Sequence, residues 1–317
     1  MIALSTPGPR LRAVLPLLLL LGLIVALAVA VPGLASPATL LLLLADTATL
    51  FVLAAGLSFV IVLGSIDLGV TATTSLAGVV TALFLPGWGV WAFPVALGMG
   101  LLVGTVTGLV HVGLRVPSFI ASLAAGGVTG GLTLWLSDAQ AVTIGQQDRT
   151  RLDWVAGETA GLPHIVGVAM VALLLGWGLQ RLTPFGRFSL AIGASEPAAV
   201  ASGVRVGRHK VFAFALAGLF AALAGIMLAA RLTSGSPTGA SQLLLPAIAA
   251  VIVGGTAITG GTGGVVPTAV GALTVSVARL GMTFLGVDAF AQQILFGVVL
   301  VGAVAITTDR ASVLVTK

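Results

Sequence analysis

The sequence has no cysteine, no tyrosine and few charged residues. Charged residues make up 7% of its 317 positions, whereas hydrophobic residues make up 58%. Since a water-soluble domain carries about 25% charged residues, this chain has too little polar material to cover a surface in water. A soluble fold is therefore excluded, and lipid is the natural solvent for the chain.

The missing cysteine excludes disulfide bonds, thiolate metal sites and cysteine nucleophiles. Lysine occurs only at Lys210 and Lys317, and neither follows a glycine, so the chain has no P-loop through which to bind ATP. The sequence also contains no H-E-x-x-H or G-x-S-x-G motif, and its three histidines are not at metal-ligand spacing. We expect no enzyme activity, no metal site and no cofactor bound by this chain.

Long apolar runs separated by glycine and proline predict about ten transmembrane helices. The first run follows Arg10 and Arg12 and resembles a signal peptide, but it is longer than a typical h-region of about 7 to 15 residues. We interpret it as a first helix. The third, eighth and ninth runs are short and rich in glycine or threonine, which favours broken or tilted helices. The predicted spans are 13–31, 40–63, 70–85, 92–112, 119–136, 165–182, 211–230, 243–258, 265–280 and 290–307.

The basic residues set the orientation of these spans. The 14 basic and 9 acidic residues give a net charge of +5, an excess that in membrane proteins marks cytoplasmic loops and gives no reason to expect a nucleic-acid partner. With both termini in the cytoplasm, ten of the 14 basic residues are cytoplasmic. The sequence thus predicts an all-α polytopic protein, N-in and C-in, with one transmembrane domain over 1–317, a cytoplasmic loop at about 183–210 and an outer loop at about 137–163. The ten are Arg10, Arg12, Arg115, Arg181, Arg187, Arg205, Arg208, Lys210, Arg310 and Lys317.

The cytoplasmic loop contains the pattern of a short helix. Ser195 is suited to cap it, alanines favour its helical body and Gly203 is suited to end it. Such a helix either docks a partner or is a solvated connection, and both interpretations stay open on the residues alone. If it docks a partner, Ala199→Arg is expected to block docking and leave the subunit folded. The candidate docking residues are Gly193, Ser195, Glu196, Ala198, Ala199 and Gly203.

Glycine pairs crowd the segment 251–266. They predict a re-entrant turn or hinge at the cytoplasmic face, with tight helix packing as the alternative. Glycines at 100, 104 and 108, and at 126, 127, 130 and 131, repeat at helical spacing and predict close helix contacts. The candidate hinge residues are Gly254, Gly255, Gly260, Gly261, Gly263 and Gly264.

Two acidic residues belong to or adjoin the predicted spans. Asp67 precedes a span that begins with Thr71 and Thr73, where a carboxylate can cap a helix N-terminus. Asp46 falls inside the second span, where an acid costs at least about 2.5 to 3.5 kcal/mol. It therefore faces a hydrated pathway with Thr71 and Thr73, or lies at the interface because the span begins later.

Three motifs resemble those of a known family in their order and spacing. They are G-S-I-D-L-G-V at 64–70, V-P-S-F-I-A-S-L at 116–123, and the block 185–264 with its glycine signature. Over nearly its whole length the chain resembles the inner-membrane permease subunits of ribose-type monosaccharide ABC importers, in the branched-chain amino acid/ribose permease superfamily. The resemblance implies a type II-like importer fold in the bacterial inner membrane.

The resemblance also implies the function and the partners. The chain would import a monosaccharide or related polyol, with ATP and Mg on a partner ABC ATPase, a periplasmic sugar-binding protein, and a second permease copy that is identical or related. Within this resemblance, 183–210 corresponds to the coupling loop. The alternative is a proton-coupled secondary transporter that uses Asp46. Which sugar is carried does not follow from the sequence.

Overall fold

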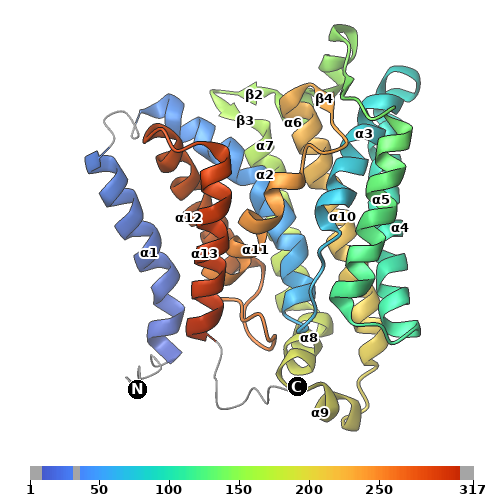
Figure 1. Cartoon of the computed structure of the whole chain (residues 1–317), viewed down its shortest axis with the longest axis vertical. Helices are drawn as coiled ribbons and strands as arrows, with labels where there is room; N and C mark the ends of the chain where they lie inside the picture. Colours follow the sequence, from blue (N-terminus) through green and yellow to red (C-terminus); the bar gives the residue numbers. More distant parts are fainter. Residues whose placement is uncertain (1–8, 31–35, 308–317) are drawn as a thin grey trace.

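A computed structural model describes residues 9–30 and 36–307, and nearly all of them belong to a bundle of α-helices (Figure 1). Each of the ten predicted spans contains a helix. Arg310 and Lys317, expected in the cytoplasm, lie outside the described residues. The helices are α1 (Pro9–Ala30), α2 (Pro37–Ile61), α3 (Val70–Trp88), α4 (Ala92–Gly113), α5 (Ser118–Leu136), α7 (His164–Leu182), α10 (Val206–Leu232), α11 (Leu244–Val253), α12 (Val265–Phe284) and α13 (Ala289–Thr307).

Six helical stretches among the described residues are long and apolar enough to cross a membrane. One of them, Val70–Gly113, contains both α3 and α4, which a 3-10 turn at Gly89–Trp91 joins into a hairpin. Shorter apolar segments occur in α1, α11 and α13. The prediction of an all-α polytopic protein is confirmed, and ten is an approximate number of spans.

The eighth predicted span, 243–258, is broken, as its short, glycine-rich run favoured. Its helix α11 has only 10 residues. At about 1.5 Å per residue it is about 15 Å long, half of the roughly 30 Å hydrocarbon core. The glycine-rich residues 254–264 follow it without regular helix, because five of their glycines have positive φ. The other two spans expected to be broken, α3 with 19 residues and α12 with 20, are continuous.

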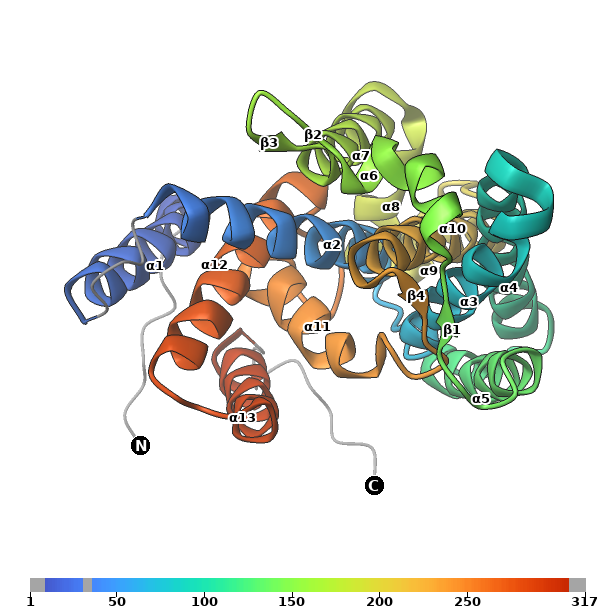
Figure 2. The ribbon, with the colours of Figure 1, turned by 90° about the horizontal axis from the view of Figure 1, so that it is seen from above.

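The core of the bundle is built on α2 and α10. Every residue of α2 from Thr47 to Ile61 is buried, and α10 packs along α2, α3 and α4. From above, α2 crosses the middle of the bundle, with α1, α11, α12 and α13 towards one end and α3, α4, α5 and α10 towards the other (Figure 2). A helix buried all round is expected to be apolar on all its faces, and in this stretch of α2 only Thr47, Thr49 and Ser58 have polar side chains.

Glycines bring α4 and α10 together as predicted. A Cβ on Gly108 would lie 2.8 Å from the Cα of Val211, and Cβ atoms on Gly100 and Gly104 would meet the backbone of Gly218 and Phe214. The prediction is wrong for most of α5. Gly126 meets Gly69, but Cβ atoms on Gly127, Gly130 and Gly131 would find no described atom within 4 Å. Spacing identifies a face of small residues, but it does not show whether a neighbour covers that face.

The two loops predicted on opposite sides of the membrane lie at opposite ends of the bundle (Figure 1). Loop 183–210 forms α8 (Pro184–Ala194) and α9 (Glu196–Ala201), at the end where α1 begins and α13 ends. Loop 137–163 carries β1 (Val142–Thr143), α6 (Asp153–Ala156), β2 (Glu158–Thr159) and β3 (Leu162–Pro163). The antiparallel strand pairs are β1 with β4 (Ser234–Gly235), and β2 with β3.

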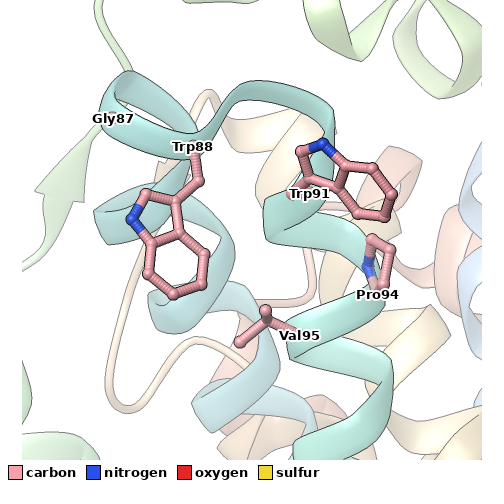
Figure 3. Close-up of a pocket in the computed structure, with 5 residues that line it drawn as sticks. All are labelled: Gly87, Trp88, Trp91, Pro94 and Val95. Atoms are coloured by element: carbon pink, nitrogen blue, oxygen red, sulfur yellow. The ribbon is translucent and has the colours of Figure 1, made fainter.

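The outer loop is fastened to the helices. Nη1 of Arg151 donates hydrogen bonds of 2.7 Å to the carbonyl oxygen of Leu85 in α3 and to the carboxylate of Asp148. A shallow groove of about 570 Å³ lies at the neighbouring hairpin between α3 and α4. Figure 3 shows the indoles of Trp88 and Trp91 on either side of it, above Val95. Exposed tryptophans at this level are typical of a membrane–water interface.

Candidate functional site

The helix predicted in the cytoplasmic loop is α9, and Ser195 is the residue before it. The Ser195 hydroxyl accepts a hydrogen bond of 3.4 Å from the backbone nitrogen of Ala198. Ser195 also ends α8, so one extended residue turns the chain between the two helices. Gly203, with φ +80°, follows the last turn. The presence of a second helix, α8, is a feature that the sequence analysis missed, although Thr183 and Pro184 form a cap and first helical residue for it.

One of the predicted docking residues of α9 does not lie at the surface. Ala199 is buried, with 5% of its surface exposed, so a large charged side chain at this position would disturb the fold. This burial argues against the expectation that Ala199→Arg leaves the subunit folded. Ser195, Glu196, Ala198 and Gly203 are exposed, and Val200 exposes 58% of its surface. An ion pair of 2.7 Å between Glu196 and Lys210 ties α9 to the first turn of α10.

The glycine-rich loop 254–264 requires glycine for two different reasons. Gly255, Gly260, Gly261, Gly263 and Gly264 have φ between +80° and +147°, a region that other residues seldom adopt. Gly254 has an ordinary φ of −63°, but a Cβ there would meet the carbonyl oxygen of Pro267. The predicted backbone turn is present.

The loop is anchored to the start of α12. Oε1 of Gln180 in α7 accepts a hydrogen bond of 2.8 Å from the backbone nitrogen of Val265. Oγ1 of Thr256 accepts one of 3.2 Å from the backbone nitrogen of Gly264. Both acceptors satisfy amides at a helix N-terminus, where intrahelical partners are lacking. Gln180 was not among the predicted residues, since a glutamine in the last turn of a predicted helix carries no sequence signal of its own.

The structure brings three of the predicted segments to one point. The backbone nitrogen of Gly261 donates a hydrogen bond of 2.9 Å to the carbonyl oxygen of Val62, which follows α2. A Cβ on Gly260 would lie 2.6 Å from the nitrogen of Gly64 and 3.0 Å from the Cα of Gly193, at the end of α8. A Cβ on Gly193 would meet Val62 and Gly261. We call these five residues, Val62, Gly64, Gly193, Gly260 and Gly261, the glycine junction.

The motif at 116–123 holds the segment that leaves this junction. The hydroxyls of Ser118 and Ser122 in α5 each accept a hydrogen bond of 3.0 Å, from the backbone nitrogens of Ile66 and Leu68. One turn further along α5, Gly126 lies against Gly69, and a Cβ on Gly126 would come within 2.9 Å of the Gly69 Cα. The second half of segment 62–69 is thus held by the start of α5, at Ile66, Leu68 and Gly69.

Asp67 lies just before α3, but it is not the predicted cap of this helix, because the N-cap residue is Gly69 and no side chain forms a cap hydrogen bond there. Its Oδ1 accepts a hydrogen bond of 2.9 Å from the backbone nitrogen of Gly69, which is the N-cap residue of α3. Burial in this connection raises the pKa of Asp67 to about 6, while the amides of Gly69 and Val70 oppose the rise. The Asp67 carboxyl group therefore bonds to the backbone that leads into α3.

Asp46 lies in α2, away from the glycine junction, and forms ion pairs that the sequence did not predict. Its Oδ1 lies 3.2 Å from Nη1 of Arg231 at the end of α10, and its Oδ2 lies 3.5 Å from Nη1 of Arg279 in α12. Because α2 begins at Pro37, Asp46 lies within the helix, and its position relative to the membrane interface stays a prediction. Thr71 and Thr73 belong to the first turn of α3, beyond the other end of α2, so the structure does not bring them to Asp46.

Comparisons with known proteins identify the family of this chain. The family model described as "Branched-chain amino acid transport system / permease component" matches residues 39–304. The chain is 36% identical to the ribose import permease protein RbsC of Bacillus subtilis over 298 residues, covering 93% of this chain and 92% of that protein. It is 34% identical to RbsC of Escherichia coli K12, covering 84% and 85%.

Two further comparisons extend this result. The L-arabinose transport system permease protein AraH of Escherichia coli K12 is 33% identical, covering 79% of this chain and 76% of that protein. Among solved structures, an ABC transporter of the metal-chelate type in an inward-facing conformation matches with a TM-score of 0.53 and 18% identity. That match covers 95% of this chain and all of the other, and it supports the fold of an ABC importer permease.

Proposed function

We propose a substrate, partners and residue roles for this chain from one premise: the chain belongs to the family of branched-chain amino acid transport system permease components. It is a multi-pass protein of the inner membrane and a permease subunit of an ABC transporter. Permeases of this kind move a solute through the bilayer, while the ATP is bound and hydrolysed by another subunit. A proton-coupled transporter finds no support, since Asp46 is paired with arginine.

The proposed substrate is a monosaccharide, with pentoses first. This choice rests on the two ribose permeases and the arabinose permease, each at least 33% identical to the chain over more than three quarters of its length. The proposed partners are an ABC ATPase that holds ATP and Mg, a periplasmic sugar-binding protein and a second permease copy. The chain itself is proposed to bind no cofactor and no metal.

The observation that carries the proposed mechanism is the glycine junction. The coupling helices α8 and α9 are proposed to receive the movement of the ATPase through Ser195, Glu196, Ala198, Val200 and Gly203. Gly193 then transmits it by direct backbone contact to the loop 254–264 and to the segment 62–69. Direct backbone contact favours this role. A shift of α8 displaces both neighbouring segments, because no side chain lies between them that could absorb the movement by changing its rotamer.

The pathway residues are proposed in two groups. Asp46 lies towards the outer end of α2, and Thr71 and Thr73 begin α3 at the other end of α2. The glycine loop, which includes Gly254 and Gly263, is proposed to change conformation between the open and closed states, because half-helices with irregular backbone are found within membranes where they line a path or are buried in protein.

Uptake by the reconstituted complex tests the proposal. Proteoliposomes that contain the permease with its ATPase and binding protein are loaded with ATP and supplied with radiolabelled D-ribose, L-arabinose or L-leucine. We expect ATP-dependent accumulation of at least one pentose and none of leucine. Accumulation of leucine without a sugar, or no accumulation of any monosaccharide, would overturn the proposed substrate class.

A further inference from the structure

A polar pocket lies near the outer ends of four helices. It has a volume of about 230 Å³ and is lined by three leucines and by five polar residues from α2, α10, α12 and α13, namely Asp46, Arg231, Arg279, Thr283 and Gln292. At about 30 Å³ per water molecule, it has room for about seven. The side chains of Asp46, Arg231 and Arg279 are 33%, 28% and 28% exposed, so a solute can reach them.

Asp46 occupies only a small part of the hydrogen-bonding capacity of the two arginines in this pocket. Each guanidinium approaches the carboxylate through Nη1 alone, at 3.2 Å for Arg231 and 3.5 Å for Arg279, and neither pair is bidentate. A guanidinium has five N–H donors and a carboxylate has about four acceptor sites. Nearby, Nε2 of Gln292 donates to the hydroxyl of Thr283 at 3.2 Å and to the carbonyl oxygen of Val287 at 3.0 Å, which fixes the orientation of the amide.

Two buried hydroxyl groups lie deeper in the bundle than this pocket. Thr49 lies three residues after Asp46 on α2, and Ser276 lies three residues before Arg279 on α12. Since α2 and α12 run in opposite directions and Asp46 contacts Arg279, both hydroxyls are one helical turn deeper on the same sides of the two helices. They expose 2% and 1% of their surfaces, and within the described part of the chain neither side-chain oxygen has a hydrogen-bond partner.

Buried hydroxyls without partners are rare, because leaving such a group unsatisfied costs about 1 to 3 kcal/mol. In helices, serine and threonine commonly bond to the carbonyl oxygen four residues earlier, as Thr133 does to Thr129. Thr49 and Ser276 depart from this behaviour at corresponding depths on two neighbouring helices. A solute or water that passes between α2 and α12 would supply the missing partners.

We infer that this pocket is a subsite for a polyol, in which Asp46 and the two arginines bind adjacent hydroxyl groups. Thr49 and Ser276 lie on the path that leads inward from it. The charges select the ligand. An anion pairs with the guanidiniums but is repelled by the carboxylate, while a cation pairs with the carboxylate but is repelled by two guanidiniums. A vicinal diol does both at neighbouring atoms, and it matches a carboxylate placed between arginines.

This inference rests on the proposed function for the identity of the sugar, and it goes beyond it by assigning a site. The competing explanation is purely structural, in which Asp46 bridges α10 and α12 and the pocket binds nothing. The two explanations differ in whether a sugar protects the pocket from chemical modification.

Cysteine labelling of the purified permease, without its binding protein, tests the inference. The chain has no cysteine, so Thr49→Cys and Ser276→Cys each provide one thiol for a small water-soluble methanethiosulfonate reagent. We expect both thiols to react, and D-ribose at about ten times its dissociation constant to slow the reaction about tenfold. Thr133→Cys, buried in α5 with 0% exposure, is the control and is expected not to react.

Arginine variants show whether the charged pocket causes the protection. Arg279→Gln in the Thr49→Cys background is expected to abolish protection by ribose, and Arg279→Lys to retain part of it. Arg149→Gln, on the exposed part of the outer loop, serves as the matched control and should leave protection intact. Size-exclusion profiles show whether each variant is folded.

Three results would overturn the inference: no labelling at either position, labelling that ribose does not slow, or protection by inorganic phosphate in place of ribose. Failure of the proposed function is a separate outcome, since it shows as absence of pentose uptake by the complete complex. Pentose uptake with no protection at Thr49→Cys would remove the subsite and leave the transport function in place.

Discussion

The backbone nitrogen of Gly261 donates a hydrogen bond of 2.9 Å to the carbonyl oxygen of Val62. This bond joins the glycine-rich loop after α11 to the segment after α2, and Gly193 at the end of α8 fits against both. Because the contacts at this point are made by backbone, the position of α8 is tied to that of two segments inside the bundle. A Cβ at Gly193 or Gly260 would overlap with backbone, so even a small substitution at the junction has a large expected effect.

Gly193→Ala is expected to push apart the backbone segments that meet at the glycine junction. Its Cβ would overlap with Val62 and Gly261, and overpacking of this kind costs about 1 to 3 kcal/mol. Gly127→Ala in α5 is the control, since a Cβ there meets no described atom within 4 Å. Thermal unfolding and ATP-driven uptake are measured for both. Equal behaviour of the two variants would contradict a transmission role for Gly193.

Val200→Asp is expected to weaken binding of the ATPase without unfolding the permease. Val200 exposes 58% of its surface on α9, whereas Ala199 beside it is buried. A central apolar contact of an interface contributes about 2 kcal/mol, so affinity for the ATPase should fall roughly 30-fold. Affinity is measured with the permease in nanodiscs. Ala199→Arg, by contrast, should reduce the folded yield. If Val200→Asp binds the ATPase as the native chain does, α9 is only a solvated connection.

Gln180→Leu is expected to destabilise the start of α12. The substitution removes the acceptor of the 2.8 Å hydrogen bond from the backbone nitrogen of Val265, and an unsatisfied amide costs about 1 to 3 kcal/mol. Gln180→Glu keeps an acceptor and adds a negative charge at a helix N-terminus, where it is favourable, so it should retain stability. The unfolding temperatures of the two variants check this. A Glu variant as unstable as the Leu variant would show that the bond is not what stabilises this end.

Asp46→Asn is expected to keep substantial transport, because the amide can still hydrogen-bond, and Asp46→Leu to lose it. Removing the carboxylate charge also leaves Arg231 and Arg279 without their shared anion. Adding Arg279→Gln to Asp46→Asn should then recover stability, with a coupling of about 0.5 to 3 kcal/mol between the two sites. Unfolding free energies of the single and double variants are the measurement, and strict additivity would argue against a shared ion pair.

The sequence by itself determined the membrane location, the approximate number and order of the helices, and the family. Apolar runs of helical length permit little else, since backbone amides in lipid must be satisfied within a helix. The short helix after Ser195 and the turn at Gly255, Gly260 and Gly261 were also predictable, because a cap and a positive φ depend on neighbours in the chain.

Only the tertiary structure decided which of these features meet. The ten-residue length of α11, the buried position of Ala199 and the contact of Gly193 with Gly260 depend on how segments distant in sequence pack together. The same holds for Asp46, whose isolated charge in the sequence becomes an ion pair with Arg231 and Arg279 in the bundle. Periodicity identifies the face on which a residue lies, but the partner across that face is set by packing of the whole chain.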